Sequence, residues 1–171
     1  MSDSIAFIPP ERDLRLASGV TRHVEDYYGY ENIMRWDIEI PLECRVPEFT
    51  LAACGIGECS GYVAFLMMDC RHCELPNCFR ILGLPDLALL IDKMLARIPA
   101  EGVLGHEEAL EHHFGSWDDF AEWVGQFENE LFRNFVRIVS TIASYCRVHA
   151  SSFNHLSPEI AKLFAEDDRD S

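Results

Sequence analysis

Apolar residues recur every three or four positions from Trp117 to Ala150, and this pattern constrains the fold more than any other feature of the chain. A helix places residues i, i+3 and i+4 on one face, so the spacing predicts an amphipathic helix over 117–150. Unbroken, it would be roughly 50 Å long, and Gly125 is the point at which it could divide. Ser116, with Asp119 three positions later, resembles a capping box and predicts that the helix begins at Trp117.

Further helical spacing precedes this segment. Apolar residues at helical intervals predict a core helix over 85–98, begun by Pro85 and ended before Pro99. A shorter helix is expected between Gly105 and Gly115, and an amphipathic stretch occupies residues 11–28. The second half of the chain is therefore predicted to be helical.

The first half shows a different pattern. Residues 34–46 alternate between apolar and polar side chains, which is typical of a half-buried strand, and residues 61–69 form an apolar run typical of a buried strand or a short helix. We therefore predict a helix-dominant α+β fold in one domain spanning residues 1–171. A Cys-rich mixed part (36–82), with a small antiparallel zinc-bound region, would pack against a helical part (85–165).

Charge and composition limit the function classes. The chain has 171 residues and a formal net charge of -15, with 29 acidic against 14 basic side chains and no basic cluster. A phosphate backbone would be repelled, which argues against direct nucleic-acid binding. The sequence has no signal-peptide pattern and no apolar run long enough to cross a membrane, so an intracellular protein, cytoplasmic or nuclear, is expected.

Cysteine spacing predicts a structural zinc site. The pairs Cys54-x4-Cys59 and Cys70-x2-Cys73 each bring two thiols from one tight turn, as a tetrahedral zinc site requires. His72 and Cys78 are alternate ligands. The competing interpretation is that these thiols are unligated and buried beside apolar segments.

Two enzymatic interpretations remain open. A thiol enzyme could use Cys70 and Cys73 as a redox pair, and a metal-dependent enzyme could use His106, His112 and His113. However, His106 and His112 are six positions apart and point in different directions on a helix, unlike the two histidines of a His-Glu-x-x-His motif. A metal-free helical interaction domain is the third possibility.

Within the long helical pattern, "TIASYCRVHA" resembles the Elongin-binding box of ubiquitin-ligase adaptors, with Ile in place of the preferred Leu. Ile142, Cys146 and Ala150 fall at i, i+4 and i+8, so one helix face would offer them to a partner's hydrophobic groove. Core packing predicts the same apolar spacing. These three residues are the predicted partner-binding face.

The segment 36–78 resembles the cysteine-rich middle of the large adenovirus early-region-four adaptor protein. The shared pattern is a Trp-Asp pair, clustered cysteines, a Gly-Tyr pair, and a Cys-His-Cys group followed by a further cysteine, here Trp36-Asp37, Cys54, Cys59, Gly61-Tyr62, Cys70, His72, Cys73 and Cys78. The chain is shorter than members of that family, is strongly acidic and carries Arg71 inside the Cys-His-Cys group.

The resemblance implies a zinc-dependent adaptor that recruits host Elongin and cullin proteins to redirect ubiquitination. We therefore predict a non-enzymatic, zinc-stabilised protein–protein interaction protein. Its specific form would be a viral early regulatory protein that acts as a ubiquitin-ligase substrate adaptor.

Overall fold

The structure is a computed structural model that describes residues 9–36, 38–68, 70–99, 103 and 105–169; the side chains of residues 56–60 lie outside the description. Within these residues the chain forms helices joined by turns and short irregular segments, and it contains no strand. The helices are α1 (Glu11–Tyr28), α2 (Tyr30–Arg35), α3 (Leu42–Ser60), α4 (Tyr62–Leu66), η1 (His72–Glu74), α5 (Leu75–Ile81), α6 (Pro85–Leu95), α7 (Glu107–Phe114), α8 (Trp117–Arg133), α9 (Phe135–Val148), η2 (Ala150–Phe153) and α10 (Pro158–Arg169).

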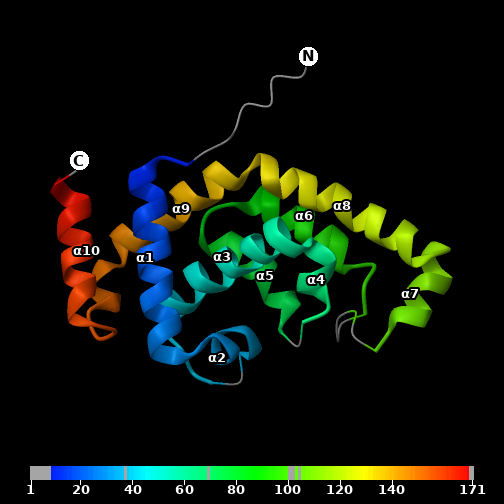
Figure 1. The fold of residues 1–171 in the computed structure, drawn as a ribbon, viewed down its shortest axis with the longest axis horizontal. Helices are drawn as coiled ribbons and strands as arrows, with labels where there is room; N and C mark the ends of the chain where they lie inside the picture. Colours follow the sequence, from blue (N-terminus) through cyan, green and yellow to red (C-terminus); the bar gives the residue numbers. More distant parts are fainter. Residues whose placement is uncertain (1–8, 37, 69, 100–102, 104, 170–171) are drawn as a thin grey trace, which may run out of the picture.

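Helix α3 crosses the middle of the molecule and organises the packing of the others (Figure 1). At one end α1 packs against α3, α9 and α10. Helices α8 and α9 follow one another along a long edge, and α7 packs against α8 at the opposite end of the molecule from α10. The two ends of the helical array are therefore α1 with α10 on one side and α7 with the start of α8 on the other.

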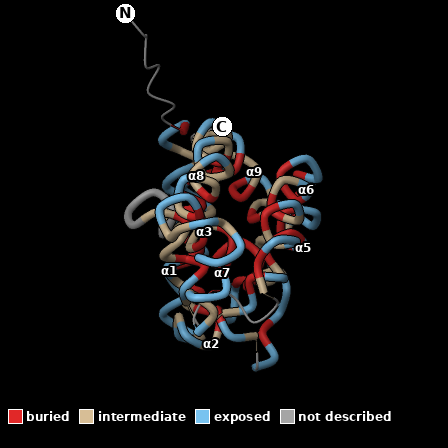
Figure 2. The backbone as a smooth tube through the Cα atoms, turned by 90° about the vertical axis from the view of Figure 1, so that its right-hand side faces the viewer, coloured by how far each residue is buried: buried red, intermediate tan, exposed pale blue. Residues whose placement is uncertain are grey.

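The core is built from apolar stripes at helical spacing. In α1 the buried stripe is Leu16, Val20 and Val24, each at most 1% exposed, at i, i+4 and i+8. Figure 2 shows buried stretches (red) facing inward, while much of α7 lies outside (pale blue). Of the helices in the described part, none combines the length and apolar character needed to cross a membrane.

The predicted α+β fold is wrong, and the alternating segment 34–46 shows why. Its apolar residues do not share one face, because Ile38 and Leu42 are exposed whereas Ile40 is buried. Instead of pairing with a strand, the chain before α3 folds around Arg45. The Arg45 guanidinium donates hydrogen bonds to the carbonyl oxygens of Asn32 (3.2 Å) and Ile38 (2.7 Å). It also lies over the ring of Trp36, 4.6 Å from the centroid.

Within the apolar run at 61–69, residues Tyr62–Leu66 form helix α4, which is the short-helix alternative and not the buried strand. Tyr62, Phe65 and Leu66 are buried at i, i+3 and i+4, which is helical spacing inside a run whose unbroken apolar character hides its period. The predicted zinc-bound antiparallel region over 36–82 is therefore replaced by α3, α4, η1 and α5.

The helix predictions of the second half are largely confirmed. Helix α6 covers most of the predicted 85–98 helix, and the Ser116 hydroxyl caps α8 by accepting a hydrogen bond from the Asp119 N–H at 3.1 Å. The 117–150 segment divides at Asn134 and not at Gly125, which lies inside α8.

A buried ion network joins α1, α9 and α10. The Asp167 carboxylate, 2% exposed, accepts hydrogen bonds from Arg12 on α1 (2.9 Å) and from Arg147 on α9 (2.7 Å). Arg147 also binds Asp13 at 2.8 Å. Since α10 otherwise buries only Ile160 completely, this network supplies much of what holds the last helix in place.

Candidate functional site

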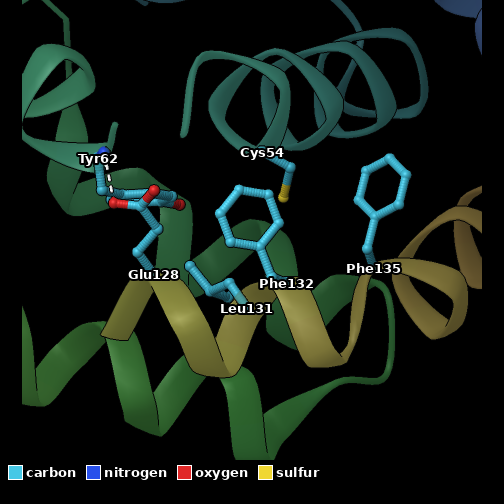
Figure 3. Close-up of a pocket in the computed structure, with 6 residues that line it drawn as sticks. All are labelled: Cys54, Tyr62, Glu128, Leu131, Phe132 and Phe135. Atoms are coloured by element: carbon cyan, nitrogen blue, oxygen red, sulfur yellow. Dashed lines mark hydrogen bonds between the residues drawn. The ribbon is translucent and has the colours of Figure 1, made fainter. Parts of the chain in front are cut away.

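The predicted ligand Cys54 lies in a small pocket between three helical segments. It projects from α3 toward Leu131 and Phe132 of α8 and Phe135 of α9, with Tyr62 of α4 beside them (Figure 3). The volume is about 10 Å³, which is about the room that a single water molecule needs. The pocket is thus a small, partly open gap between helices, and it is too small for a substrate.

Tyr62 is the main polar side chain of this pocket. Its backbone N–H donates to the Glu128 carboxylate at 3.1 Å, which ties the start of α4 to α8. Its hydroxyl is buried and has no hydrogen-bond partner among the described residues. Burial, followed by repulsion from Cys54, Cys70 and Glu128, raises the pKa of Tyr62 well above its ordinary value. The phenol is therefore neutral at physiological pH and can donate a hydrogen bond.

The other predicted zinc ligands have different environments. Cys70 is half-buried and, with Cys54, lies close enough to Tyr62 to affect its pKa. Cys73 is exposed on η1. Cys59 lies in the last turn of α3, and its side chain is outside the description.

The alternate ligands face the interior. His72 is buried, with its Nε2 2.9 Å from the carbonyl oxygen of Phe65 and its ring edge-on to that phenyl. Cys78 is buried in α5, where burial and the charge of Glu74 raise its pKa to about 12. Among the side chains that the structure describes, no three potential ligands gather as a metal site requires. Cys54 and Cys70 both affect the pKa of Tyr62, and the four-cysteine zinc site stays a prediction.

The predicted partner-binding face is part of the core. Ile142 and Cys146 are 0% exposed, and Ala150 at the start of η2 is half-buried. Burial raises the pKa of the Cys146 thiol to about 12. Helix α9 packs against α1 and α3, so the apolar spacing that resembles an Elongin-binding box here serves internal packing.

The three histidines of the metal-dependent alternative lie in different surroundings. His106 precedes α7, and His112 is exposed. His113 stacks edge-on against Phe114, with its Nε2 3.4 Å from an Arg97 nitrogen. Arg97 in turn lies over the rings of Phe114 (4.7 Å) and Trp123 (5.0 Å). The Arg97 guanidinium therefore packs within a cluster of aromatic rings formed by His113, Phe114 and Trp123.

A buried carboxylate that sequence reasoning missed is Glu48 of α3. It is 6% exposed and lies in a groove of about 380 Å³ with Thr21 and Glu25 of α1. Burial, and then the charge of Glu25, raise the pKa of Glu48 to about 7. In the sequence, the indication that this carboxylate is buried is its position between two apolar residues, Pro47 and Phe49.

No family model, curated protein or solved structure matches this chain. The resemblance to the adenovirus adaptor therefore stays a prediction based on residues 36–78. Of its Trp-Asp pair, Asp37 lies outside the described residues, while Trp36 packs edge-on against Phe49 and holds Arg45.

Proposed function

We propose that the protein is a non-enzymatic protein–protein interaction protein that meets its partner through an acidic surface. The observation that carries this proposal is the unequal use of charge in the fold. Most arginines are engaged within the molecule, whereas many carboxylates face solvent without a cationic partner among the described residues. With 29 acidic against 14 basic side chains, the surface that a partner meets is therefore predominantly negative.

The internal use of arginine takes two forms. Some guanidinium groups pair with carboxylates of the same or a neighbouring segment, and others pack on aromatic rings. The first set is Arg12, Arg71, Arg80, Arg133, Arg137 and Arg147, and the second is Arg45 and Arg97.

Three buried thiols outside the Cys70–Cys73 pair belong to the core and are not candidates for thiol chemistry. Burial raises the pKa of Cys44, Cys78 and Cys146 to about 12 in each case. The thiolate is the nucleophilic form of cysteine, so these three side chains stay protonated and unreactive near neutral pH. Their contribution is to packing.

In its specific form, the proposal is the ubiquitin-ligase adaptor that the resemblance implies, stabilised by zinc. Because Ile142 and Cys146 are buried, Elongin binding through this face requires α9 to separate from α1 and α3. Mixing the protein with purified Elongin tests this form. Complex formation with faster hydrogen exchange in α9 supports it, and absence of a complex removes the adaptor form while leaving the broader proposal in place.

The broader proposal is tested by affinity capture from the cells that express the protein. The bait is compared with a variant in which exposed carboxylates of α7 and α10 become amides (Glu108→Gln, Glu111→Gln, Glu159→Gln, Glu166→Gln and Asp168→Asn). We expect a defined partner that is released by salt and captured less by the variant. Identical capture by both baits, or no enrichment over a tag-only bait, contradicts the proposal.

A further inference from the structure

An open groove with a volume of about 510 Å³ lies where the chain leaves α6 and passes α7. Its lining is mostly apolar and consists of Ala96, Arg97, Ile98, Pro99, Ala109, Leu110 and His113. Ile98 and Leu110 are 8% and 3% exposed, so this part of the lining is fixed by the core. An apolar lining with a few polar groups is the usual composition of a ligand site.

Both polar side chains of the lining are basic, although the chain as a whole is acidic. Arg97 and His113 line the groove, whereas Glu107, Glu108 and Glu111 of α7 do not. In a chain with a formal net charge of -15, a groove lined by an arginine and no described carboxylate differs from the surface around it. The charge nearest to a ligand in the groove is therefore the positive charge of Arg97.

Aromatic stacking holds the Arg97 guanidinium in place. Its central carbon lies 4.7 Å from the ring centroid of Phe114 and 5.0 Å from that of Trp123. One of its nitrogens lies 3.4 Å from Nε2 of His113, and no carboxylate pairs with it in the part of the chain that the structure describes. A guanidinium carries five N–H donors in its plane. Arg97 therefore keeps donors for a carboxylate, which arginine binds through two parallel hydrogen bonds.

We propose that this groove binds the C-terminal carboxylate of a partner protein whose last residue is aliphatic. The carboxylate pairs with the Arg97 guanidinium beside His113, and the aliphatic side chain lies over Ala109 and Leu110. Charge complementarity selects an anion, because Arg97 is the charged group of the lining. The apolar residues of the lining select an aliphatic group next to that anion.

A chain terminus supplies both groups from a single residue, because its carboxylate and its side chain branch from the same Cα atom. A fatty acid also combines them, but an open groove would leave most of its long chain in water. The site has the opposite charge to the acidic surface of the proposed function, and it is tested independently of that surface.

The test uses a synthetic peptide of Gly, Ser and Ala that ends in Leu with a free carboxylate and carries a fluorescent label at its N-terminus. Its binding to the full chain is followed by fluorescence anisotropy. Arg97→Lys keeps the charge and removes the planar guanidinium, and Ala109→Glu places a carboxylate at the groove. Ala109 is exposed, so this substitution leaves the core intact. The matched controls are Arg133→Lys on α8 and Ala161→Glu on α10, both at exposed positions.

We expect each groove variant to weaken binding about tenfold, which corresponds to about 1.4 kcal/mol, and each control to bind like the wild type. The same peptide with a C-terminal amide should bind at least about tenfold more weakly, because it lacks the anion. A peptide that ends in Ser should also bind more weakly, because it lacks the aliphatic group. In NMR spectra, the peptide should shift the amide signals of residues 96–98 and 109–113 most.

The inference would be overturned by no saturable binding of the peptide, by equal binding of its acid and amide forms, or by equal affinities of Arg97→Lys and Arg133→Lys. Unchanged binding by Ala109→Glu with a wild-type melting curve would also overturn it. Octanoate that displaces the peptide and binds at least as tightly would assign the groove to a fatty acid and remove the partner terminus. None of these results contradicts the proposed function, because its test is the capture of a partner by the acidic surface.

Discussion

Glu48 shows how one buried side chain links packing to pH. The charged form loses hydration between α1 and α3 and faces Glu25, while Thr21 provides only partial compensation. Arg22 lines the same groove, and Tyr30 of α2 lies near enough for Glu48 to raise its pKa. Because burial raises the pKa of Glu48 from 4.5 to about 7, this side chain is protonated in the folded protein and ionised in the unfolded chain between these two pH values.

Because of this difference in protonation, we expect Glu48 to destabilise the fold increasingly as the pH rises. The folded state binds more protons than the unfolded state between about pH 4.5 and 7, so the free energy of unfolding should fall across that range. Glu48→Gln should be nearly neutral at pH 5 and stabilising by up to about 3 kcal/mol at pH 8. Urea denaturation at both pH values measures this difference. Glu39→Gln, at an exposed site, is the control, and an effect of Glu48→Gln that is equal at both pH values would contradict the assignment.

Thiol reactivity should divide the cysteines by their environment. In chelator-treated protein at pH 8, the exposed Cys73 should be alkylated first. Cys44 and Cys146, whose pKa values burial raises to about 12, should react at least about a hundredfold more slowly than in the unfolded chain. Peptide mapping by mass spectrometry gives the rate for each site. Equal rates in the folded and the urea-unfolded protein would show that these two thiols are not buried.

At the scale of helices, α10 is joined to α1 and α9 through one carboxylate, that of Asp167. Asp167→Asn removes the carboxylate that binds Arg12 and Arg147, and we expect a loss of about 2 kcal/mol. This is less than the loss for a fully buried pair, because the two arginines are 31% and 28% exposed. Ion pairing also holds the pKa of Asp167 well below its usual range. This stabilisation is therefore present above about pH 4 and is lost as the pH falls below it.

Hydrogen exchange in α10 measures the effect of Asp167→Asn on this helix. Amides of α10 should exchange faster in the variant, while those of α3 keep their protection. The neighbouring Asp168 is exposed, so Asp168→Asn is the matched control and should change neither. Unchanged exchange in α10 of Asp167→Asn would mean that apolar contacts alone hold the helix.

The helices also show how far the sequence alone predicts this fold. Long periodic segments such as 85–98 and 117–133 reveal their helices because one stripe faces the core. Short segments mislead, since four alternating apolar residues over 36–42 fit a strand although Ile38 and Leu42 face solvent. In that region the side chain of Arg45 bonds to the carbonyl oxygens of Asn32 and Ile38, and an apolar–polar pattern does not contain such contacts.

The arrangement of the candidate site is likewise only partly predictable from the sequence. Cysteine spacing predicts that Cys54 and Cys70 share a zinc site, which stays a prediction, and it does not reveal that Cys78 faces the core from α5. The Ile142 face illustrates a further ambiguity. Core packing and partner docking both require an apolar stripe, and only the position of α1 and α3 against α9 distinguishes them.

For the whole molecule, the position of the cysteines determines what zinc could stabilise. The proposed ligands belong to the segment from α3 to η1, whereas α1, α9 and α10 pack together through Leu16, Val20, Ile138 and the Asp167 network. These contacts include none of the proposed ligands. Zinc, if bound, should therefore stabilise the segment from α3 to η1 directly, and α1 and α9 only through their packing on α3.

Removal of zinc should therefore affect the segment from α3 to η1 more than the other helices. Native mass spectrometry of the tag-free protein should find one zinc per chain, and Cys54→Ser or Cys70→Ser should lose it, whereas Cys44→Ser should keep it. Because structural zinc binding contributes folding free energy, chelation should reduce the helical circular-dichroism signal and speed hydrogen exchange in 54–75. Exchange in α1, α9 and α10 should change little. A protein that binds no zinc and melts identically with and without chelator would contradict the zinc site, and the cysteines of α3 to η1 would then serve packing in a metal-free helical interaction domain.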